Sequence, residues 1–384
     1  MMRLLPLEYA VRNLLRDPWR LLQLAGGSAL VALLLLATGG FSAGMRGAMA
    51  GSGDPANTIL LGAGSEGSLE RSSLDPATAA IVSGSIDGLR DVAGAPAVSP
   101  EVVHMTLVEA SGSTAQATLR GVTPMAFAVH RGARLAAGSL PQGDQLLVGR
   151  LAHRRLGLPE DAVRPGALIR LEGRDFTVSG TFAAPGTVYE GELWAPLDAL
   201  MAATKRTTIS TVVVARDRAE QADIETFAAM RLDLELSAIG EAEYYAERGS
   251  FFAPIRAMAW LTALLIAGGA VFGGLNTFHA AFAARRREAA TVLAIGFPRR
   301  AVFVSFLIEA TLVGALGTLA ALLVAVLLLD GAALSVPGGA FSLDLDAATL
   351  ALGLGAGLAL GPLGALLPAW RCLSPPLPSA LRSA

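Results

Sequence analysis

The sequence predicts a membrane protein with four transmembrane α-helices and an α+β extracytoplasmic domain inserted between helices 1 and 2. Three observations support this fold class. The 384 residues are 53% hydrophobic and only 16% charged, with a mean hydropathy of +0.53, which is too apolar for an ordinary soluble domain. Four apolar runs are each long enough to cross a bilayer, which takes about 20 helical residues. Between the first two runs, short strand-like segments alternate with Gly, Pro and Asp.

The N-terminal region joins a basic lead-in to the first apolar run. Residues 1–20 are expected to form an amphipathic helix on the cytoplasmic membrane surface, followed by the first span at 21–41. A cleaved signal peptide is the alternative, since Ala48-Met49-Ala50 resembles a small-residue cleavage site. The apolar run is longer than the roughly 7–15 residues of a signal sequence, which favours a retained helix.

Residues 42–254 are expected to form the extracytoplasmic domain. Strand patterns occur at Val102–Val108, Leu168–Leu171, Phe176–Val178 and Thr211–Ala215, and helical patterns at about 75–92, 150–156 and 219–232. This mixture predicts an α+β domain of two lobes. A β-rich insertion at about 111–209 would form the second lobe and leave the first lobe nearest the membrane.

The remaining elements follow in order: a second span at 255–284, a cytoplasmic helix at 285–300, a third span at 301–329, an outer loop at 330–346, a fourth span at 347–370 and a cytoplasmic tail at 371–384. Arginines set the orientation, because cytoplasmic flanks carry the Lys/Arg excess. The segments 1–20, 285–300 and 371–384 together contain eleven arginines and three acidic residues, whereas 42–254 contains 18 basic and 25 acidic residues. Both termini are therefore expected in the cytoplasm.

Several classes of function are disfavoured by the sequence. The sequence contains no strongly basic segment of the kind that indicates nucleic-acid binding. The single cysteine, Cys372, excludes a Cys-based zinc site, and the four histidines show no metal-ligand spacing. The only lysine, Lys205, does not follow a glycine-rich loop, so this chain contains no P-loop. We therefore expect no catalytic residue, no metal and no cofactor in this chain.

One short motif carries a possible hydrolase signal. Gly40-Phe-Ser-Ala-Gly44 matches the nucleophile elbow of hydrolases, which needs a strand-to-helix turn to expose its serine. Here the motif ends an apolar run and has no strand before it. A membrane-anchored hydrolase using Ser42 is the most distant of the functions that we consider.

The spans also contain informative polar and small residues. Glu309 is the one carboxylate within a span, where an uncompensated charge is costly. It has no basic partner in its own helix, and both a structural and a proton-carrying role are open. Small residues at four-residue spacing allow close helix contact, and they occur at Gly353, Gly357 and Gly361 and again at Gly269 and Gly273. Packing within one subunit and a dimer seam explain this spacing equally well.

The segment from Asn276 to Glu309 resembles the MacB/FtsX-like family of ABC transporter permeases. The residues that match at the family's spacing are Asn276, Arg285, Glu288, Ala294, Gly296 and Phe306-Leu-Ile-Glu-Ala310. The C-terminal Pro368-Ala-Trp-Arg371 and Ser379-Ala-Leu-Arg382 are also similar to the family's ending, although Pro375-Pro376 replaces the usual linker. In the outer region, the stretches 146–152, 156–158, 176–180 and 194–197 resemble the MacB-type periplasmic core domain. The resemblance covers nearly the whole chain.

This resemblance implies a split transporter of the LolC/LolE or DevC type, because no ATPase is found on this chain. The implied partners are a separate ABC ATPase subunit, which would hold ATP and Mg, and a second permease copy or a paralogue. A membrane-fusion protein or a periplasmic acceptor is a further candidate partner. The family's coupling helix, which contacts the ATPase, corresponds to Arg285, Arg286, Arg287, Glu288, Leu293, Ala294, Gly296 and Pro298.

The resemblance also implies the function. In this family, the permease converts ATP hydrolysis by its partner into movement of the extracytoplasmic domain, which is called mechanotransmission. The expected output is export of a substrate, or its extraction from the periplasm or the outer leaflet, by a protein of the cytoplasmic (inner) membrane. The alternative is an FtsX-like regulator of a cell-wall hydrolase that transports nothing.

Overall fold

The computed structural model describes residues 11–374 apart from 13, 15, 337 and 338. Most of the predicted lead-in at 1–20 and of the predicted tail at 371–384 lies outside the described residues. The chain forms two compact units. We call Met1–Ala43, Pro254–Gly331 and Leu343–Ala384 the membrane unit, and Gly44–Ala253 with Ala332–Ser342 the outer domain.

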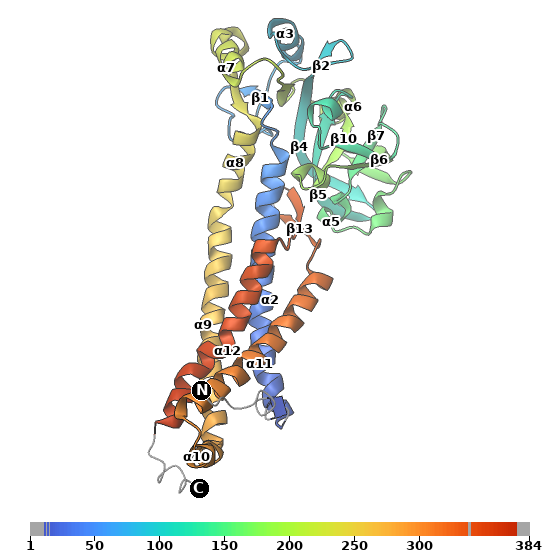
Figure 1. Ribbon diagram of the computed structural model, residues 1–384. Helices are drawn as coiled ribbons and strands as arrows, with labels where there is room; N and C mark the ends of the chain where they lie inside the picture. The colour runs from blue at the N-terminus through green and yellow to red at the C-terminus, as the bar shows by residue number, and fades with distance from the viewer. Residues whose placement is uncertain (1–10, 13, 15, 337–338, 375–384) are drawn as a thin grey trace. The chain divides into compact units, whose positions relative to one another are not determined.

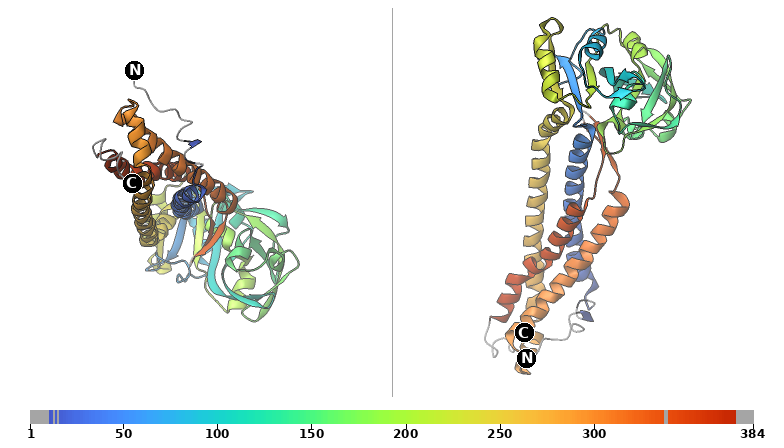
Figure 2. Two further views of the ribbon diagram at one scale, coloured as in Figure 1. Left: turned by 90° about the horizontal axis from the view of Figure 1, so that it is seen from below. Right: turned by 45° about the horizontal axis from the view of Figure 1, so that its top comes forward.

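The membrane unit is built on long apolar helices (Figure 1). Within the described residues, four helices are long and apolar enough to cross a membrane. They are α2 (Pro18–Ser52), α9 (Ala253–Ala284), α11 (Arg299–Leu328) and α12 (Ala347–Leu373). Helix α2 runs past the predicted end of the first span at residue 41, because the following residues contain no proline and include the good helix formers Ala and Met. The short helix α10 (Arg286–Ala294) connects α9 to α11 (Figure 2).

Aromatic and small side chains hold the membrane unit together. Phe282 of α9 stacks on Phe306 of α11, with ring centroids 4.3 Å apart and planes 11° apart. Ala365 and Ala369 of α12 complete this buried cluster. Helix α9 contributes little else to the interior, and most of its large apolar side chains are exposed, including Met258, Leu265 and Phe272. Such a surface faces lipid or another helix when a bilayer surrounds the protein.

The outer domain is built on a mixed ten-stranded sheet of order β12-β1-β11-β4-β5-β10-β7-β9-β6, with β8 paired to β4 and β9. The strands are β1 (Asn57–Gly62), β4 (Val98–Ala110), β5 (Ser113–Val122), β6 (Arg134–Gly138), β7 (Gln145–Gly149), β8 (Leu168–Leu171), β9 (Arg174–Ala183), β10 (Leu193–Pro196), β11 (Thr211–Ala215) and β12 (Leu236–Gly240).

Strand β4 joins the two parts of this sheet. Its residues Val98–Glu101 pair with β11, and its residues Val102–Ala110 pair with β5. The β-rich part therefore begins at Val102, earlier than the predicted boundary at about residue 111. The reason is that one continuous strand serves both parts, so no break in the sequence marks the change. The apolar interior runs through both parts, from Leu60 and Val212 to Leu146 and Phe176.

Short helices cover the sheet. They are α3 (Thr78–Ser85), α4 (Ala126–Val129), α5 (Ala152–Arg155), α6 (Leu197–Thr204), α7 (Gln221–Met230) and α8 (Glu241–Phe251), with 3₁₀ turns η1 (Glu160–Val163), η2 (Val188–Gly191) and η3 (Leu232–Leu234). Helix α3 ends well before residue 92, because Gly88 adopts φ +81° and the hairpin β2 (Asp91–Val92)–β3 (Ala95–Pro96) follows. The predicted loop at 330–346 contains a hairpin, β13 (Ala333–Val336) and β14 (Gly339–Ser342), that packs on α5 and η2.

Candidate coupling site and buried charge network

Helix α10 has one packed face and one open face. Ala289 and Ala290 are buried, whereas Arg287, Glu288, Thr291, Ala294 and Ile295 are exposed. The large apolar side chain of Ile295 is 73% exposed. After the helix, Gly296 adopts φ +102°, a left-handed conformation that favours glycine, and Pro298 precedes the first turn of α11. The chain therefore presents a short helix with an exposed isoleucine and mixed charges between two long helices.

An ion pair fixes the start of α10 to α11. The Arg285 guanidinium donates from NH1 to both carboxylate oxygens of Glu309, each at 2.9 Å. It also lies 3.6 Å from Glu288 and 5.5 Å from the centre of the Phe306 ring. The Arg285 and Glu309 side chains are only 12% and 13% exposed. The partner of Glu309 thus comes from the α9–α10 junction, which reasoning confined to one helix could not identify.

The predicted coupling residues occupy different environments. Glu288 is exposed and also accepts a hydrogen bond from Arg16 at 3.0 Å. Arg286 and Leu293 are half-buried, so they face the helices more than the open side. Ala294, Gly296 and Pro298 lie on the exposed surface with Arg287. Asn276 is exposed on α9 and does not join the Arg285–Glu309 pair.

The glycines divide into packed and open positions. A Cβ at Gly353 would collide with Leu36, one at Gly357 with Thr318, and one at Gly361 with the backbone carbonyl of Ala310. These α12 glycines therefore serve packing within the chain. In contrast, a Cβ at Gly269 or Gly273 of α9 would meet nothing within 4 Å.

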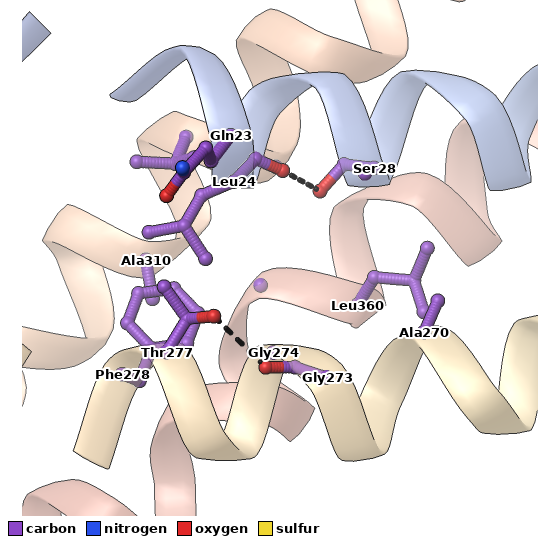
Figure 3. A pocket seen from close by; sticks show the side chains of 14 residues that line it. Gln23, Leu24, Ser28, Ala270, Gly273, Gly274, Thr277, Phe278, Ala310 and Leu360 are labelled. Carbon is purple, nitrogen blue, oxygen red and sulfur yellow. Dashed lines mark hydrogen bonds between the residues drawn. The ribbon is translucent and has the colours of Figure 1, made fainter. Parts of the chain in front are cut away.

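Gly273 borders a cavity of about 250 Å³ enclosed by α2, α9, α11 and α12 (Figure 3). Its hydroxyl groups are already engaged within their own helices: Ser28 donates to the Leu24 carbonyl at 3.1 Å, and Thr277 donates to the Gly273 carbonyl at 3.0 Å. The other side chains that line the cavity are apolar, apart from the exposed Gln23.

The outer domain contains a buried network of five charged side chains, which we call the buried charge network. Its members are Glu101 of β4, Arg120 of β5, His130 after α4, Glu192 before β10 and Glu241 of α8, and each is between 0% and 4% exposed. Arg120 donates to Glu192 at 2.7 and 2.8 Å and to Glu101 at 2.7 Å. His130 lies 2.7 Å from Glu101 and 3.3 Å from Glu241. Buried charges are tolerated when they are paired in this way.

This network also fixes the ends of α2 and α8 to the β-rich part. Glu241, the first residue of α8, accepts hydrogen bonds from the Asp54 backbone and from Asn57 at 3.0 and 2.8 Å. The Tyr189 hydroxyl donates to Glu241 at 3.0 Å, and it lies 3.3 Å from the carbonyl of Ser52, the last residue of α2. The Ser52 hydroxyl accepts from the Val188 backbone at 2.8 Å. These hydrogen bonds connect the ends of both helices to η2.

Protonation strengthens the network. Burial alone would lower the pKa of His130, but the carboxylates of Glu101 and Glu241 outweigh it and raise this pKa to about 10. Burial alone would raise the pKa of Glu101, yet His130 and Arg120 lower it to about 2. His130 is therefore an imidazolium and Glu101 a carboxylate at neutral pH.

Comparison with known families agrees with both units. A model described as the FtsX-like permease C-terminal matches residues 260–377. A model described as the MacB-like periplasmic core domain matches residues 21–229, which is more than half of the chain. This chain belongs to the MacB/FtsX-like family of ABC transporter permeases. It is therefore a membrane protein with an extracytoplasmic domain, either an ABC transporter permease or an FtsX-like regulator, in a family that works with an ABC ATPase subunit.

Solved structures similar to part of this MacB/FtsX-like permease include the two that follow. The periplasmic region of MacB from Actinobacillus actinomycetemcomitans is 15% identical, with 50% of this chain and 91% of that chain covered and a TM-score of 0.39. The extracellular domain of the ABC-type transporter YknZ from Gram-positive bacteria is 16% identical, with 48% and 99% covered and a TM-score of 0.38. No curated protein matches the sequence of this chain.

The structure also bears on the motifs that lie outside the permease pattern. Ser42 lies inside helix α2, where its hydroxyl accepts a hydrogen bond from the Trp260 indole at 3.1 Å. The strand-to-helix turn of a nucleophile elbow is therefore missing around Ser42. Ala48 and Met49 of the possible cleavage site are buried within the same helix. No group of three or more potential metal ligands occurs among the described residues.

Proposed function

We propose that this permease converts ATP hydrolysis by a separate ATPase subunit into movement of its outer domain, for export of a substrate or its extraction from the periplasm or the outer leaflet. The observation that carries the proposal is helix α10, which pairs an exposed face with a rigid connection to α11 through Arg285 and Glu309. A docking helix needs both properties, since it must contact a partner and transmit force without bending away.

The path of force can be followed through named contacts. A push on α10 reaches α11 through the Arg285–Glu309 pair and the Phe282–Phe306 stack. It reaches α9 directly, because Arg285 alone separates the two helices. In the outer domain, α8 precedes α9 in the chain, and Glu241 and Ser52 tie α8 and α2 to the buried charge network. Movement of these helix ends would therefore carry the β-rich part with them.

The proposal includes an assembly and an orientation. The arginine distribution supports a cytoplasmic location for α10 and both termini, with the outer domain in the periplasm of a cytoplasmic-membrane protein. Two permease subunits, identical or paralogous, would each dock one ATPase, which supplies ATP and Mg. The exposed apolar face of α9 is the described surface best suited to lipid or to the second subunit.

Co-purification tests the proposal. The tagged full chain is extracted from its native membrane in mild detergent, with trapped nucleotide, and co-purifying P-loop ATPases are identified. We expect Ile295→Asp to abolish ATPase capture, because a charge would replace the exposed apolar contact. The matched control is Leu107→Asp, since Leu107 is a 63% exposed leucine of β4 in the outer domain.

Two results would count against the proposal. Capture that is equal for Ile295→Asp and the unmutated chain would exclude α10 as the docking helix. Capture of an ATPase together with a cell-wall hydrolase, with no export defect on deletion, would favour the FtsX-like regulator instead.

A further inference from the structure

The outer domain contains a cavity of about 640 Å³ that the proposed coupling does not use. One wall is the glycine-rich loop after β1, from Gly64 to Ser68, with Arg71 beyond it. The opposite wall is the end of α8, which contributes Tyr244, Glu247, Arg248, Phe251 and Phe252, and Met105 of β4 lines the space between them. This volume lies in the range of pockets that bind small molecules, about 300–1,000 Å³.

The cavity combines an apolar wall with opposite charges. Phe251 is 77% exposed, an unusual state for a phenylalanine in a water-facing domain, and Phe252 is buried beside it. Arg248 is engaged with Glu70 at 2.9 Å and with the Tyr244 hydroxyl at 2.8 Å. Glu66 accepts a hydrogen bond from the Gly64 backbone at 3.0 Å.

Two charged side chains in the cavity are unpaired. Among the described residues, neither the Arg71 guanidinium nor the Glu247 carboxylate has a side-chain partner, and both are exposed. The cavity thus offers the Arg71 cation and the Glu247 carboxylate for a ligand, together with the Glu66 carboxylate, which is hydrogen-bonded to the Gly64 backbone, and the apolar surface of Phe251. This combination is complementary to an amphiphile whose polar end carries both charges.

Chain connectivity relates this cavity to the bilayer. The aromatic wall at Phe251 and Phe252 is followed directly by α9, the candidate span Ala253–Ala284, with no intervening loop. At about 1.5 Å per residue, a 32-residue helix is roughly 48 Å long, whereas a bilayer with its headgroup layers is about 40–45 Å thick. If the arginines at 285–287 lie at one headgroup layer, the first residue of α9 lies near the other.

We propose that this cavity binds the headgroup of a zwitterionic phospholipid from the outer leaflet. Arg71 would pair with the phosphate, Glu247 with the ammonium group, and Phe251 would contact the start of the acyl chains. A peptide is the competing class of ligand, and its binding is one outcome of the test. The inference does not depend on docking of an ATPase, because binding is measured without nucleotide or partner.

The test uses the purified full chain and lipid titration followed by native mass spectrometry. The probes are dioctanoyl phosphatidylethanolamine and phosphatidylcholine, which are zwitterionic, and dioctanoyl phosphatidylglycerol, which has the phosphate without the amine. We expect both zwitterionic lipids to bind more tightly than phosphatidylglycerol. Arg71→Glu and Glu247→Lys should each weaken zwitterionic binding by at least about tenfold, as expected for loss of a charge-assisted contact.

Matched controls are Arg134→Glu and Glu160→Lys, which reverse exposed charges elsewhere in the outer domain and should leave binding unchanged. A second readout is Phe251→Trp, for which brominated phosphatidylethanolamine should quench fluorescence beyond the quenching that it causes in the unmutated chain, which has four tryptophans of its own. Equal affinity for all three lipids, or equal losses in the controls and the cavity variants, would overturn the proposal. Binding of peptides with no lipid preference would assign the cavity to the competing class.

Discussion

The two units of this permease bury charge by different means. The outer domain encloses five charged side chains at 0–4% exposure, and each of them contacts at least one side chain of opposite charge. The membrane unit contains the largely buried pair Arg285–Glu309, and its glycines let α12 approach α2 and α11 closely. The first arrangement is a network of charges, whereas the second combines a pair of charges with close helix packing.

This difference follows from the surrounding solvent. In a water-facing domain, burial of apolar side chains drives folding, so the large apolar interior around the network offsets the cost of removing charges from water. In a bilayer, lipid tails are as apolar as leucine, and helices associate through close packing and a few polar contacts. A membrane unit is therefore expected to depend on small residues, and an outer domain on the completeness of its charge pairing.

The largest expected effect comes from removing Arg120, the centre of the network. Arg120→Met leaves Glu101 and Glu192 without their guanidinium, and breaking a buried pair costs about 3–5 kcal/mol. The measurement is thermal unfolding of the full chain in detergent. The control is Arg134→Met at an exposed position. Equal shifts for the two variants would show that the network contributes no stability.

The second prediction concerns pH. Because the pKa of His130 is raised in the folded state to about 10, its contribution is complete below its unfolded value of about 6.5 and is lost as pH rises toward 10. The pKa of Glu101 is lowered to about 2, so its contribution is complete above about 4.5 and is lost as pH falls toward 2. The pair thus contributes most at about pH 4.5–6.5.

We therefore expect the outer domain to unfold at a lower temperature at pH 9 than at pH 6. Burial raises the pKa of Tyr189 and Tyr245 further above this window, so they do not contribute. His130→Gln removes the titrating group and should reduce the fall in unfolding temperature between pH 6 and pH 9. If the unfolding temperature of His130→Gln fell as much between pH 6 and pH 9 as that of the unmutated chain, another group would be responsible for the loss of stability.

The third prediction moves to the membrane unit. Gly361→Ala places a methyl group against the Ala310 backbone carbonyl, which cannot rotate away, so α11 and α12 must separate. Overpacking of this kind costs about 1–3 kcal/mol. Gly269→Ala is the matched control, because a Cβ there meets nothing within 4 Å. The two variants are compared by thermal unfolding in the same detergent, and an equal response would contradict close packing as the main tie.

The smallest effect is expected for the Arg285–Glu309 pair. A double-mutant cycle with Arg285→Met, Glu309→Leu and the double variant should give a coupling energy of about 0.5–2 kcal/mol. Each single variant removes the contact and keeps one largely buried charge, so the double variant should be more stable than either. If the role of Glu309 were proton transfer rather than pairing, Glu309→Gln would abolish transport. The double-mutant cycle would then give a coupling energy near zero.

The spans could be predicted because their signal is local. Length and apolarity identify α9, α11 and α12 within a few residues, and a short run of β-branched residues identifies β11. The extra length of α2 was missed, because its last turns leave the apolar run and pack as part of the outer domain. Likewise, β4 crosses between two parts of the sheet without any change in residue type.

The buried charge network could not be predicted in the same way, because its members come from separate elements and only the fold brings them together. Arg120 offered a weak sequence signal, since it is a charged residue directly after the apolar Leu119 within strand β5. The sequence shows only that His130 lacks metal-ligand spacing, whereas the structure buries it and pairs it with Glu101. The Arg285–Glu309 pair contains two residues that the family spacing identified, but their contact depends on the turn between α9 and α11.

The most direct test of force transmission is a distance measurement between the two units of one chain. Spin labels at Leu107→Cys in the outer domain and Leu264→Cys in α9, both exposed positions, are introduced in a Cys372→Ser background. Double electron–electron resonance is then recorded for the complex with its ATPase, with and without trapped ATP. We predict that ATP shifts the distance distribution in this complex and that the shift is absent for Ile295→Asp mixed with the same ATPase and ATP, because this variant does not capture the ATPase. Superimposable distributions in a complex that hydrolyses ATP would contradict the proposed mechanism.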